Sequence, residues 1–312
     1  MSMYTVLATP RSFAKENPLP LRLLEEGGCT VIRPRDDEER RSLLVEADGV
    51  IAGLEEYGAA TLETCKKLKV ISRYGVGYDA IDLDVARKKG IRVAYTPGAN
   101  GDSVADLAIG LMLAAARHIP RMDTAIKKRA EERPSGIELW RKTLGVLGTG
   151  RIGKGVMQRA SGFETRFLCY DTYRDEEYVS RLGGAYTDLE TLYAQSDFIT
   201  VHLPLTDETR GMIAEAEFRK MKNTAIIVNT ARGGIVDENA LYEALKNGEI
   251  FAAGLDATVE EPPYESPLRT LSNCILTPHV GAATIEATHN MGMMAVENLL
   301  EVLKTGTCRY IV

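Results

Sequence analysis

Arg232, Glu261 and His279 each stand in a loop after a predicted strand, and their side chains suit anion binding and proton transfer. An arginine can hold a carboxylate through two parallel hydrogen bonds, and a histidine exchanges a proton near neutral pH. Taken alone, Arg232 could be a surface residue and His279 a structural one. Open α/β sheets, however, bind ligands beyond the carboxyl ends of their strands. Together the three residues indicate a site that binds a small anion and moves a proton.

The residues around these side chains predict tightly held loops. Gly233 and Gly234 follow the arginine and allow a sharp turn, after which Asp237 is placed to cap the next helix. Glu261 precedes Pro262 and Pro263, which restrict the backbone around it. A carboxylate held in this way could orient the imidazole and favour its charged form.

A glycine-rich segment between a predicted strand and a predicted helix indicates a phosphate-binding loop. It reads Gly148-Thr-Gly150-Arg-Ile-Gly153. In such a loop the first glycine allows the tight turn and the second lets the backbone approach a pyrophosphate. The third glycine allows close packing of helix on strand. The alternative is an incidental glycine-rich turn, and the strand before it and the helix after it argue against that.

Asp171 ends the next predicted strand, which is where dinucleotide-binding folds place an acid that binds the ribose hydroxyls. Its charge would repel a 2′-phosphate, so the sequence predicts NAD rather than NADP as cofactor. Arg174 lies close by in the sequence and could offset part of that repulsion.

The elements that must position these residues alternate between short β-branched runs and helical stretches, as in parallel α/β proteins. Two series of strands are predicted, each sufficient for one doubly wound parallel sheet. The first comprises Tyr4–Ala8, Thr30–Arg33, Gly49–Gly53, Lys69–Arg73 and Arg92–Tyr95. The second comprises Thr143–Leu147, Arg166–Tyr170, Phe198–His202, Ala225–Asn229, Ala252–Leu255 and Cys274–Thr277.

A turn-rich segment near Thr96–Gly101 marks the predicted domain boundary. We expect a first domain over 1–100 and a second over 101–284, which opens on a long helix capped by Ser103 with Asp106 in its first turn. A final helix, roughly Ile285–Lys304, has no second sheet of its own to cover. We therefore expect residues 285–312 to return to the first domain, which makes that domain discontinuous.

Composition excludes several classes of function. The formal net charge of −6 and the isoelectric point near 5.5 argue against a nucleic-acid-binding protein. The 5 cysteines are scattered without a CxxC pair, so we expect no metal site and a reducing compartment. No signal peptide is evident, and the longest apolar run, Leu107–Ala116, is about half of a membrane span. These features predict a soluble, cytoplasmic protein without a membrane partner.

Four motifs in this order and spacing resemble the D-isomer-specific 2-hydroxyacid dehydrogenase family, with phosphoglycerate dehydrogenase as the nearest branch. They are GTGRIG, NTARGGIVDE, GLDATVEEPP and TPHVGAAT, and the segments SRYGVGYDAID and NGDSVADLAIGLML are similar to the family as well. The resemblance runs from about Lys69 to Ala283. It implies two Rossmann-like domains with a discontinuous substrate domain, and homodimers built around the helix that begins near Ser103.

The resemblance also assigns roles to individual residues. Arg232 would bind the substrate, Glu261 would be the carboxylate partner and His279 the acid/base. The backbone N–H groups of Val76 and Gly77 would help to hold the substrate carboxylate. The implied NAD-binding residues are Gly148, Gly150, Arg151, Ile152, Gly153, Asp171, Thr230, Ala231 and Asp256, the last near the nicotinamide amide. His202 is a weaker candidate for a cofactor contact.

The substrate stays open between 3-phosphoglycerate, hydroxypyruvate and glyoxylate. The loop after the third strand, where phosphoglycerate dehydrogenases of this type often carry an arginine, here contains Glu55 and Glu56. Arg73 could still reach a distal anionic group. The alternative to an enzyme is a corepressor-like protein that senses NAD(H) and binds partner peptides. The two differ in whether any 2-oxo acid is turned over.

Overall fold

The computed structural model describes residues 3–312, which divide into two compact units. The first comprises the chain up to Asn100 together with Ala282–Val312, and the second comprises Gly101–Gly281. The domain boundaries predicted from the sequence lie after residues 100 and 284, and the unit boundaries of the structure lie after residues 100 and 281. Each unit is a parallel α/β structure, which confirms the predicted fold class.

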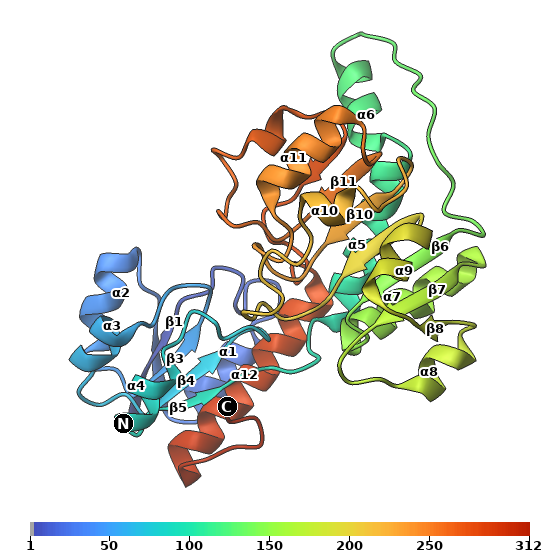
Figure 1. The fold of residues 1–312 in the computed structure, drawn as a ribbon. Helices are drawn as coiled ribbons and strands as arrows, with labels where there is room; N and C mark the ends of the chain where they lie inside the picture. Colours follow the sequence, from blue (N-terminus) through green and yellow to red (C-terminus); the bar gives the residue numbers. More distant parts are fainter. Residues whose placement is uncertain (1–2) are drawn as a thin grey trace. The chain divides into compact units, whose positions relative to one another are not determined.

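The first unit is built on a five-stranded parallel sheet in the order β2-β1-β3-β4-β5 (Figure 1). Its strands are β1 (Tyr4–Ala8), β2 (Cys29–Ile32), β3 (Gly49–Ala52), β4 (Val70–Arg73) and β5 (Arg92–Ala94). Its helices are α1 (Leu19–Glu26), α2 (Asp37–Leu44), α3 (Ala59–Thr64), α4 (Leu83–Lys88) and α12 (Ile285–Thr305). All five strands agree with the prediction to within one residue at each end, because each is a short β-branched run that ends in polar or turn residues.

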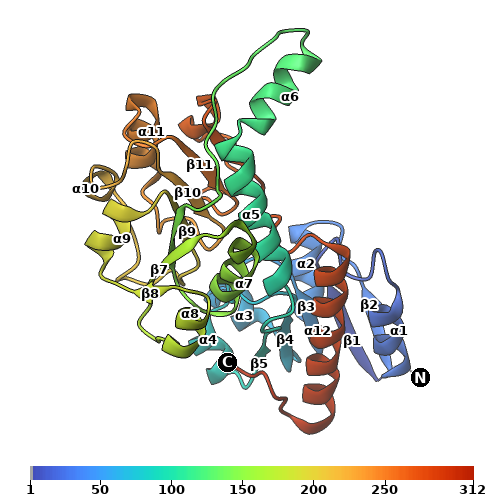
Figure 2. The same ribbon diagram turned by 90° about the vertical axis from the view of Figure 1, so that its right-hand side faces the viewer.

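The C-terminal helix α12 packs on this first sheet, as expected for a discontinuous domain (Figure 2). Thr284 caps its N-terminus by accepting a hydrogen bond from the Ala287 N–H. The Ser72 hydroxyl of β4 donates to the Ala295 carbonyl at 2.7 Å, and the Asn298 amide donates to the Tyr95 carbonyl at 2.9 Å. Leu299 is fully buried in the core that the helix shares with the sheet.

The second unit contains a seven-stranded parallel sheet in the order β12-β11-β10-β9-β6-β7-β8. Its strands are β6 (Thr143–Leu147), β7 (Arg166–Tyr170), β8 (Ala185–Tyr186), β9 (Phe198–Val201), β10 (Ile226–Asn229), β11 (Ala252–Leu255) and β12 (Cys274–Leu276). Six of these were predicted. The edge strand β8 was not, because two residues are too few to form a recognisable pattern.

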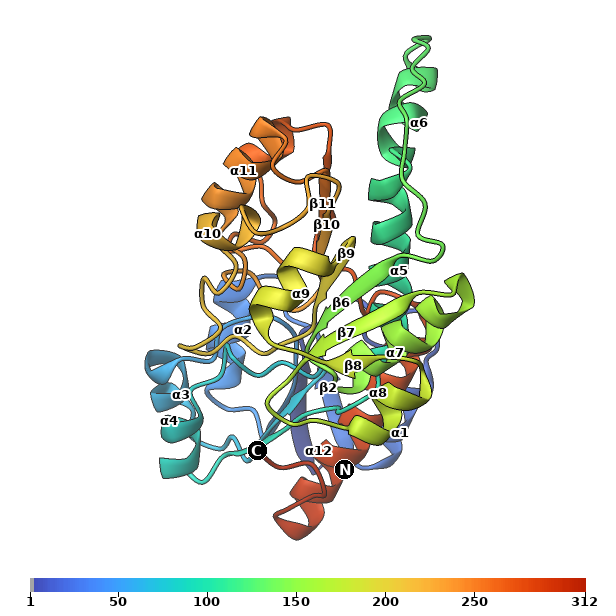
Figure 3. The same cartoon turned by 45° about the vertical axis from the view of Figure 1, so that its right-hand side comes forward.

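Helices cover both faces of the second sheet. They are α5 (Gly101–Ala116), α6 (Ile119–Lys127), α7 (Arg151–Ala160), α8 (Glu176–Arg181), α9 (Leu189–Gln195), α10 (Glu215–Phe218) and α11 (Glu238–Asn247). Helix α5 packs against α7 and strands β10 and β11. Helix α6 and the extended stretch 128–139 project away from the body of this unit (Figure 3).

The predicted start of α5 was three residues too late, which is nearly one helical turn. The helix begins at Gly101, so Ser103 lies inside its first turn, where it is 9% exposed, and does not cap it. The first-turn acid is Asp102 rather than Asp106, and both carboxylates pair with Arg159 of α7. The sequence favoured Ser103 because serine is a preferred cap, whereas in the fold Ser103 and Val104 are buried inside the first turn.

Chain order reverses direction in the second sheet beside β6, which has β9 on one side and β7 on the other. Since all strands are parallel, the loops after β6, β7 and β9 to β12 leave the sheet at one edge. A topological switch of this kind is where open α/β sheets bind ligands. No helix within residues 3–312 is long and apolar enough to cross a membrane.

Candidate active site

The glycine loop after β6 leaves no room for side chains at two of its positions. Gly148 has a φ of +94°, and a Cβ there would lie 2.7 Å from the carbonyl carbon of His202. A Cβ on Gly153 would lie 2.0 Å from the Gly148 carbonyl oxygen. The first glycine is therefore required by the turn and the third by the close packing of α7 on the loop, as the sequence predicted.

The middle glycine faces open space. A Cβ on Gly150 would meet nothing within 4 Å, and Gly150 is also the residue before α7, which begins at Arg151. The first N–H groups of a helix have no partner within it and attract anions. Residues Gly150, Arg151 and Ile152 thus form an open, electropositive cradle, and this geometry fits the pyrophosphate of a dinucleotide.

Asp171, just beyond β7, is tied to the glycine loop. Its Oδ2 accepts hydrogen bonds from the Thr149 N–H at 2.6 Å and from the Thr149 hydroxyl at 3.1 Å. Its Oδ1 accepts one from the Tyr173 N–H at 2.9 Å. A carboxylate oxygen has about two acceptor positions, so Oδ1 retains one for an external donor such as a ribose hydroxyl.

Arg232 follows β10 in a loop that lies against the loop after β11. A Cβ on Gly233 would stand 2.2 Å from the backbone carbonyl of Thr258, so only glycine permits this approach. The Arg232 carbonyl accepts from the Asn229 amide at 2.8 Å, and its guanidinium donates to the Ala231 carbonyl at 2.7 Å. Asp237 caps α11 as predicted, by accepting from the N–H groups of Asn239 and Ala240.

Glu261 and His279 form a hydrogen-bonded pair in loops at the carboxyl end of the sheet. The His279 Nδ1 lies 2.7 Å from the Glu261 Oε2, and the two side chains are 27% and 32% exposed. The backbone of His279 has a φ of +54°, a conformation that non-glycine residues adopt mainly where surrounding contacts impose it. With Nδ1 committed to the carboxylate, Nε2 is the ring nitrogen left for a reacting group.

The loop that carries His279 is held by Asp256, which is 2% exposed. Its Oδ1 accepts from the Thr277 hydroxyl at 2.6 Å and from the Val280 N–H at 2.8 Å, and its Oδ2 accepts from the Gly281 N–H at 2.8 Å. The His279 N–H also donates to the Asp256 carbonyl at 3.0 Å. The predicted contact of Asp256 with the nicotinamide amide stays a prediction.

His202, after β9, is held between two threonines. Its Nε2 lies 2.8 Å from the Thr200 hydroxyl and its Nδ1 lies 3.5 Å from the hydroxyl of Thr230. Burial lowers the pKa of His202 to about 3, so the ring is neutral at physiological pH. Thr230 and Ala231 are each 8% exposed, beside this ring and the Arg232 loop.

In the first unit, Arg73 is bound by its own surroundings. Its Nε donates to the Gly77 carbonyl at 2.7 Å, and its Nη1 donates to the carbonyls of Ala52 and Tyr74 at 3.1 and 2.9 Å. The side chain is 8% exposed. The predicted reach of Arg73 to a distal anion stays a prediction, but the guanidinium already serves to shape the turn that contains Val76 and Gly77.

The cysteines are unsuited to nucleophilic chemistry. Burial raises the pKa of Cys169 and of Cys274 to about 12, and all five cysteines are free thiols. Within residues 3–312, no group of three or more His, Cys, Asp or Glu side chains could hold a metal ion.

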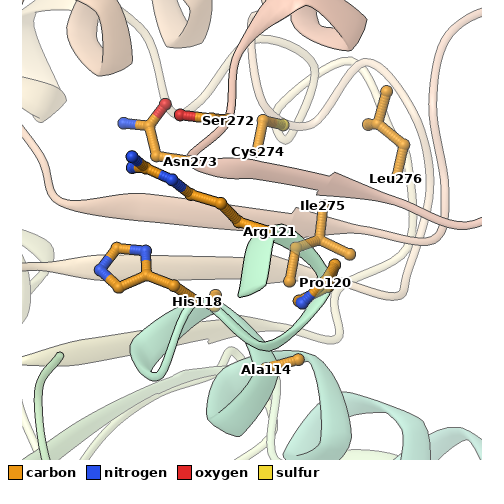
Figure 4. Close-up of a pocket in the computed structure, with 10 residues that line it drawn as sticks. Ala114, His118, Pro120, Arg121, Ser272, Asn273, Cys274, Ile275 and Leu276 are labelled. Carbon is orange, nitrogen blue, oxygen red and sulfur yellow. The ribbon is translucent and has the colours of Figure 1, made fainter. Parts of the chain in front are cut away.

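A cavity of about 190 Å³ lies alongside the edge strand β12 rather than beyond its carboxyl end (Figure 4). Figure 4 shows His118 and Arg121, from the junction of α5 and α6, opposite Ser272, Asn273 and Cys274. Arg121 is paired with Glu132. The cavity is thus separate from the loops that carry Arg232, Glu261 and His279.

Residues 109–281 match the model of the family described as D-isomer specific 2-hydroxyacid dehydrogenase, NAD binding domain. The chain belongs to the D-isomer specific 2-hydroxyacid dehydrogenase family. This membership confirms the resemblance found in the sequence and identifies the unit with the glycine loop as an NAD-binding domain.

Similar members of the family carry different substrate names. The chain is 45% identical over 289 residues to D-3-phosphoglycerate dehydrogenase of Methanocaldococcus jannaschii, an alignment that covers 91% of this chain and 55% of that protein. It thus spans about half the length of that relative. It is 43% identical over 274 residues to hydroxypyruvate reductase of Thermotoga maritima, covering 86% of this chain and 89% of the relative.

The fold is shared with solved structures of the family. D-lactate dehydrogenase of Aquifex aeolicus, solved with NAD and lactic acid, is 30% identical, with a TM-score of 0.84 and coverage of 96% of this chain and 95% of that one. The architecture and the order of the elements are therefore those of a family in which members bind NAD.

The structure also shows two sets of hydrogen bonds between loops that could not be predicted from the sequence. Thr149 stands between the first two glycines and binds Asp171, although any residue is allowed at this position of the motif. Asp256 fixes the His279 loop through backbone N–H groups. Neither bond has a signal in sequence, because each joins loops that follow different strands.

Proposed function

We propose that this protein is an NAD-dependent D-2-hydroxyacid dehydrogenase that interconverts a small 2-oxo acid and the corresponding 2-hydroxy acid. The observation that carries the proposal is the 2.7 Å pair of His279 and Glu261 in the unit that contains the glycine loop. The relatives described above have enzyme names, which favours catalysis over the alternative of a corepressor-like binding protein.

His279 is the acid/base in this proposal. During reduction, negative charge develops on the oxygen at C2, and the imidazolium donates the Nε2 proton to it. The Glu261 carboxylate accepts from Nδ1–H, so it fixes the ring orientation and favours the charged form of the imidazole. In the oxidative direction the neutral ring takes the proton from the hydroxyl group of the substrate.

Arg232 binds the anionic end of the substrate and polarises the carbonyl group, since a guanidinium fork matches a carboxylate. Its loop abuts the loop of Glu261 through the contact of Gly233 with Thr258. NAD, when bound, supplies the hydride chemistry, and the protein residues supply orientation, charge neutralisation and the proton. The residues proposed to hold NAD are Gly148, Gly150, Arg151, Ile152, Gly153, Asp171, Thr230, Ala231 and Asp256.

In the other unit, Val76 and Gly77 are proposed to donate their N–H groups to the substrate carboxylate. Within residues 3–312 neither N–H donates to another group of the chain. Arg73 holds the Gly77 carbonyl at 2.7 Å and thereby fixes the turn that presents them. Such a pair of backbone donors is a suitable partner for an anion.

The substrate we favour is not phosphorylated. The loop after β3 presents the Glu55 carboxylate, which accepts from the Thr9 hydroxyl at 3.0 Å, and it contains no basic residue. Arg73, which ends the neighbouring strand β4, donates hydrogen bonds to three backbone carbonyls. A phosphate would meet negative charge at this end of the sheet, so glyoxylate and hydroxypyruvate fit better than a phosphorylated acid.

A panel of 2-oxo acids with NADH absorbance as the readout tests the proposal. We expect turnover of glyoxylate or hydroxypyruvate with kcat/KM at least tenfold above that of 3-phosphohydroxypyruvate. NADH binding without reduction of any acid in the panel would support the binding-protein alternative and refute the enzymatic proposal.

We further propose a cytoplasmic homodimer that associates through α5 and α6. Helix α6 exposes Ile119 to 50% and Ile126 to 68%, and apolar side chains on a projecting helix favour a protein partner. The five free thiols suit a reducing compartment. Light scattering after size-exclusion chromatography tests the dimer. The parent protein should have the mass of a dimer, and Ile126→Asp should shift that mass toward the monomer. A parent protein with the mass of a monomer would refute the proposed dimer.

A further inference from the structure

Tyr186, on the edge strand β8, is connected to Asp171 through a chain of hydrogen bonds. The Asp175 N–H lies 2.8 Å from the Tyr186 hydroxyl oxygen, which lies 2.7 Å from the Thr149 hydroxyl. The Thr149 hydroxyl lies 3.1 Å from the Asp171 Oδ2. The chain joins three segments of the NAD-binding domain: the glycine loop, the loop after β7, and β8.

The direction of these hydrogen bonds is fixed by their two ends. An amide N–H can only donate and an ionised carboxylate can only accept. The Thr149 hydroxyl must therefore donate its hydrogen bond to Asp171, and the Tyr186 hydroxyl must donate to Thr149. Every hydroxyl in the chain donates toward Asp171, and hydrogen bonds aligned in this way strengthen one another.

The same tyrosine holds the basic residue that could weaken selection for NAD. The guanidinium carbon of Arg174 lies 5.3 Å from the centre of the Tyr186 ring, and its Nη1 lies 3.8 Å from the Glu176 carboxylate. Its side chain is 52% exposed. Tyr186 thus positions an acid that repels a 2′-phosphate and restrains a cation that would attract one.

We propose that Tyr186 is a positioning residue for dinucleotide choice, which acts through Thr149 on Asp171. This inference rests on the proposed function, in which Asp171 binds the ribose hydroxyls of NAD. Asp171 needs one acceptor position on Oδ1 directed at the ribose, and the hydroxyl chain fixes the carboxylate through Oδ2. Losing the Tyr186 hydroxyl leaves the Asp175 N–H and the Thr149 hydroxyl each without a partner on that side, and both loops loosen.

Calorimetric titration with NADH and with NADPH, without substrate, tests the proposal. Tyr186→Phe keeps the aromatic ring beneath Arg174 and removes only the hydroxyl. We expect its Kd for NADH to rise about three- to tenfold while its Kd for NADPH stays within about twofold, so the preference for NADH narrows. Thr149→Val should narrow the preference for NADH further, whereas Thr149→Ser, which keeps a hydroxyl, should retain the preference of the parent protein.

Tyr178→Phe is the matched control, because its hydroxyl donates to the Lys154 carbonyl at 3.1 Å and lies outside the chain that ends on Asp171. Its two Kd values should equal those of the parent protein. Equal weakening of NADH and NADPH by Tyr186→Phe, or no change in either, would overturn the inference.

Asp171→Ala separates failure of this inference from failure of the proposed function. If the parent protein binds both dinucleotides equally and Asp171→Ala changes neither, the proposed role of Asp171 fails. If Asp171→Ala abolishes the preference for NADH while Tyr186→Phe leaves it intact, only the role of Tyr186 fails. Under our proposal, Tyr186→Phe has no further effect on the ratio of the two Kd values in the Asp171→Ala protein.

Discussion

The carboxylate of Asp256 fixes the backbone of Gly281: its Oδ2 accepts the Gly281 N–H at 2.8 Å. Its Oδ1 accepts the neighbouring Val280 N–H at the same distance, so both oxygens hold the chain directly after His279. Asp256 follows β11 and His279 follows β12, which are adjacent strands. His279, the proposed acid/base, is thereby held by a buried carboxylate in addition to its pairing with Glu261.

Asp256→Asn should loosen this loop. An amide nitrogen cannot accept a hydrogen bond, so at least one backbone N–H loses its buried acceptor, at a cost of about 1–3 kcal/mol in the free energy of unfolding. We expect kcat for 2-oxo-acid reduction to fall at least tenfold, because His279 is no longer held in place. Urea unfolding and steady-state kinetics measure the two effects, and a variant with parental stability and kcat would show that the anchor is unimportant.

Arg232→Ala should damage substrate use and leave NADH affinity almost intact. Loss of a charged, bidentate interaction of about 3 kcal/mol corresponds to a fall of about 100-fold in kcat/KM. Arg232→Lys restores the charge without the planar fork and should recover only part of the loss. Fluorescence titration with NADH, run beside the kinetics, would reveal a misplaced residue if cofactor binding were lost while the substrate KM stayed normal.

His202 makes the stability of the NAD-binding domain depend on pH. Burial lowers the pKa of His202 to about 3, below the value near 6.5 of an unfolded histidine. Below pH 6.5 the unfolded chain takes up a proton that the folded domain does not. The stabilisation present above pH 6.5 is therefore lost by about 1.4 kcal/mol per pH unit as the pH falls toward 3.

Urea unfolding followed by the fluorescence of Trp140, which lies in the same unit, measures this dependence. Between pH 6.5 and 5.0 the parent protein should lose about 2 kcal/mol more than His202→Asn. His118→Asn serves as the control, since it leaves His202 in place and should keep the parental slope. Identical slopes for the parent and His202→Asn would contradict the burial of a neutral ring.

The sequence predicted most of the second sheet because its buried strands are short apolar runs, such as Phe198–Val201, bounded by polar residues. It missed β8, which consists of Ala185 and Tyr186, and with it the hydroxyl chain to Asp171. It misplaced the start of α5 because Ser103 is a good cap in isolation, whereas in the fold this serine is buried inside the first turn.

The same contrast holds at the site. The glycine spacing is a local signal, and the pairing of Glu261 with His279 was predicted from the resemblance of their motifs to the family. The bonds of Asp256 to Val280 and Gly281, and of Arg73 to the Gly77 carbonyl, are made with backbone atoms. Backbone partners have no side-chain identity to recognise, so these bonds become visible only in the folded chain.

The Glu261–His279 pair is the centre of the proposed mechanism, and Glu261→Gln isolates it. The amide has nearly the same size as the carboxylate but no charge, so the imidazolium loses stabilisation and releases its proton at lower pH. Reduction of a 2-oxo acid requires the protonated ring. His279→Ala should lower kcat by about 10² to 10⁴, the usual contribution of a positioned acid or base.

The pH–rate profile of 2-oxo-acid reduction by the parent protein and by Glu261→Gln is the most direct measurement. The account predicts that the alkaline limb of the profile, where the rate falls as the ring loses its proton, moves to lower pH in the variant. An unmoved limb in Glu261→Gln, together with nearly full activity of His279→Ala, would contradict the assignment of His279 as the acid/base.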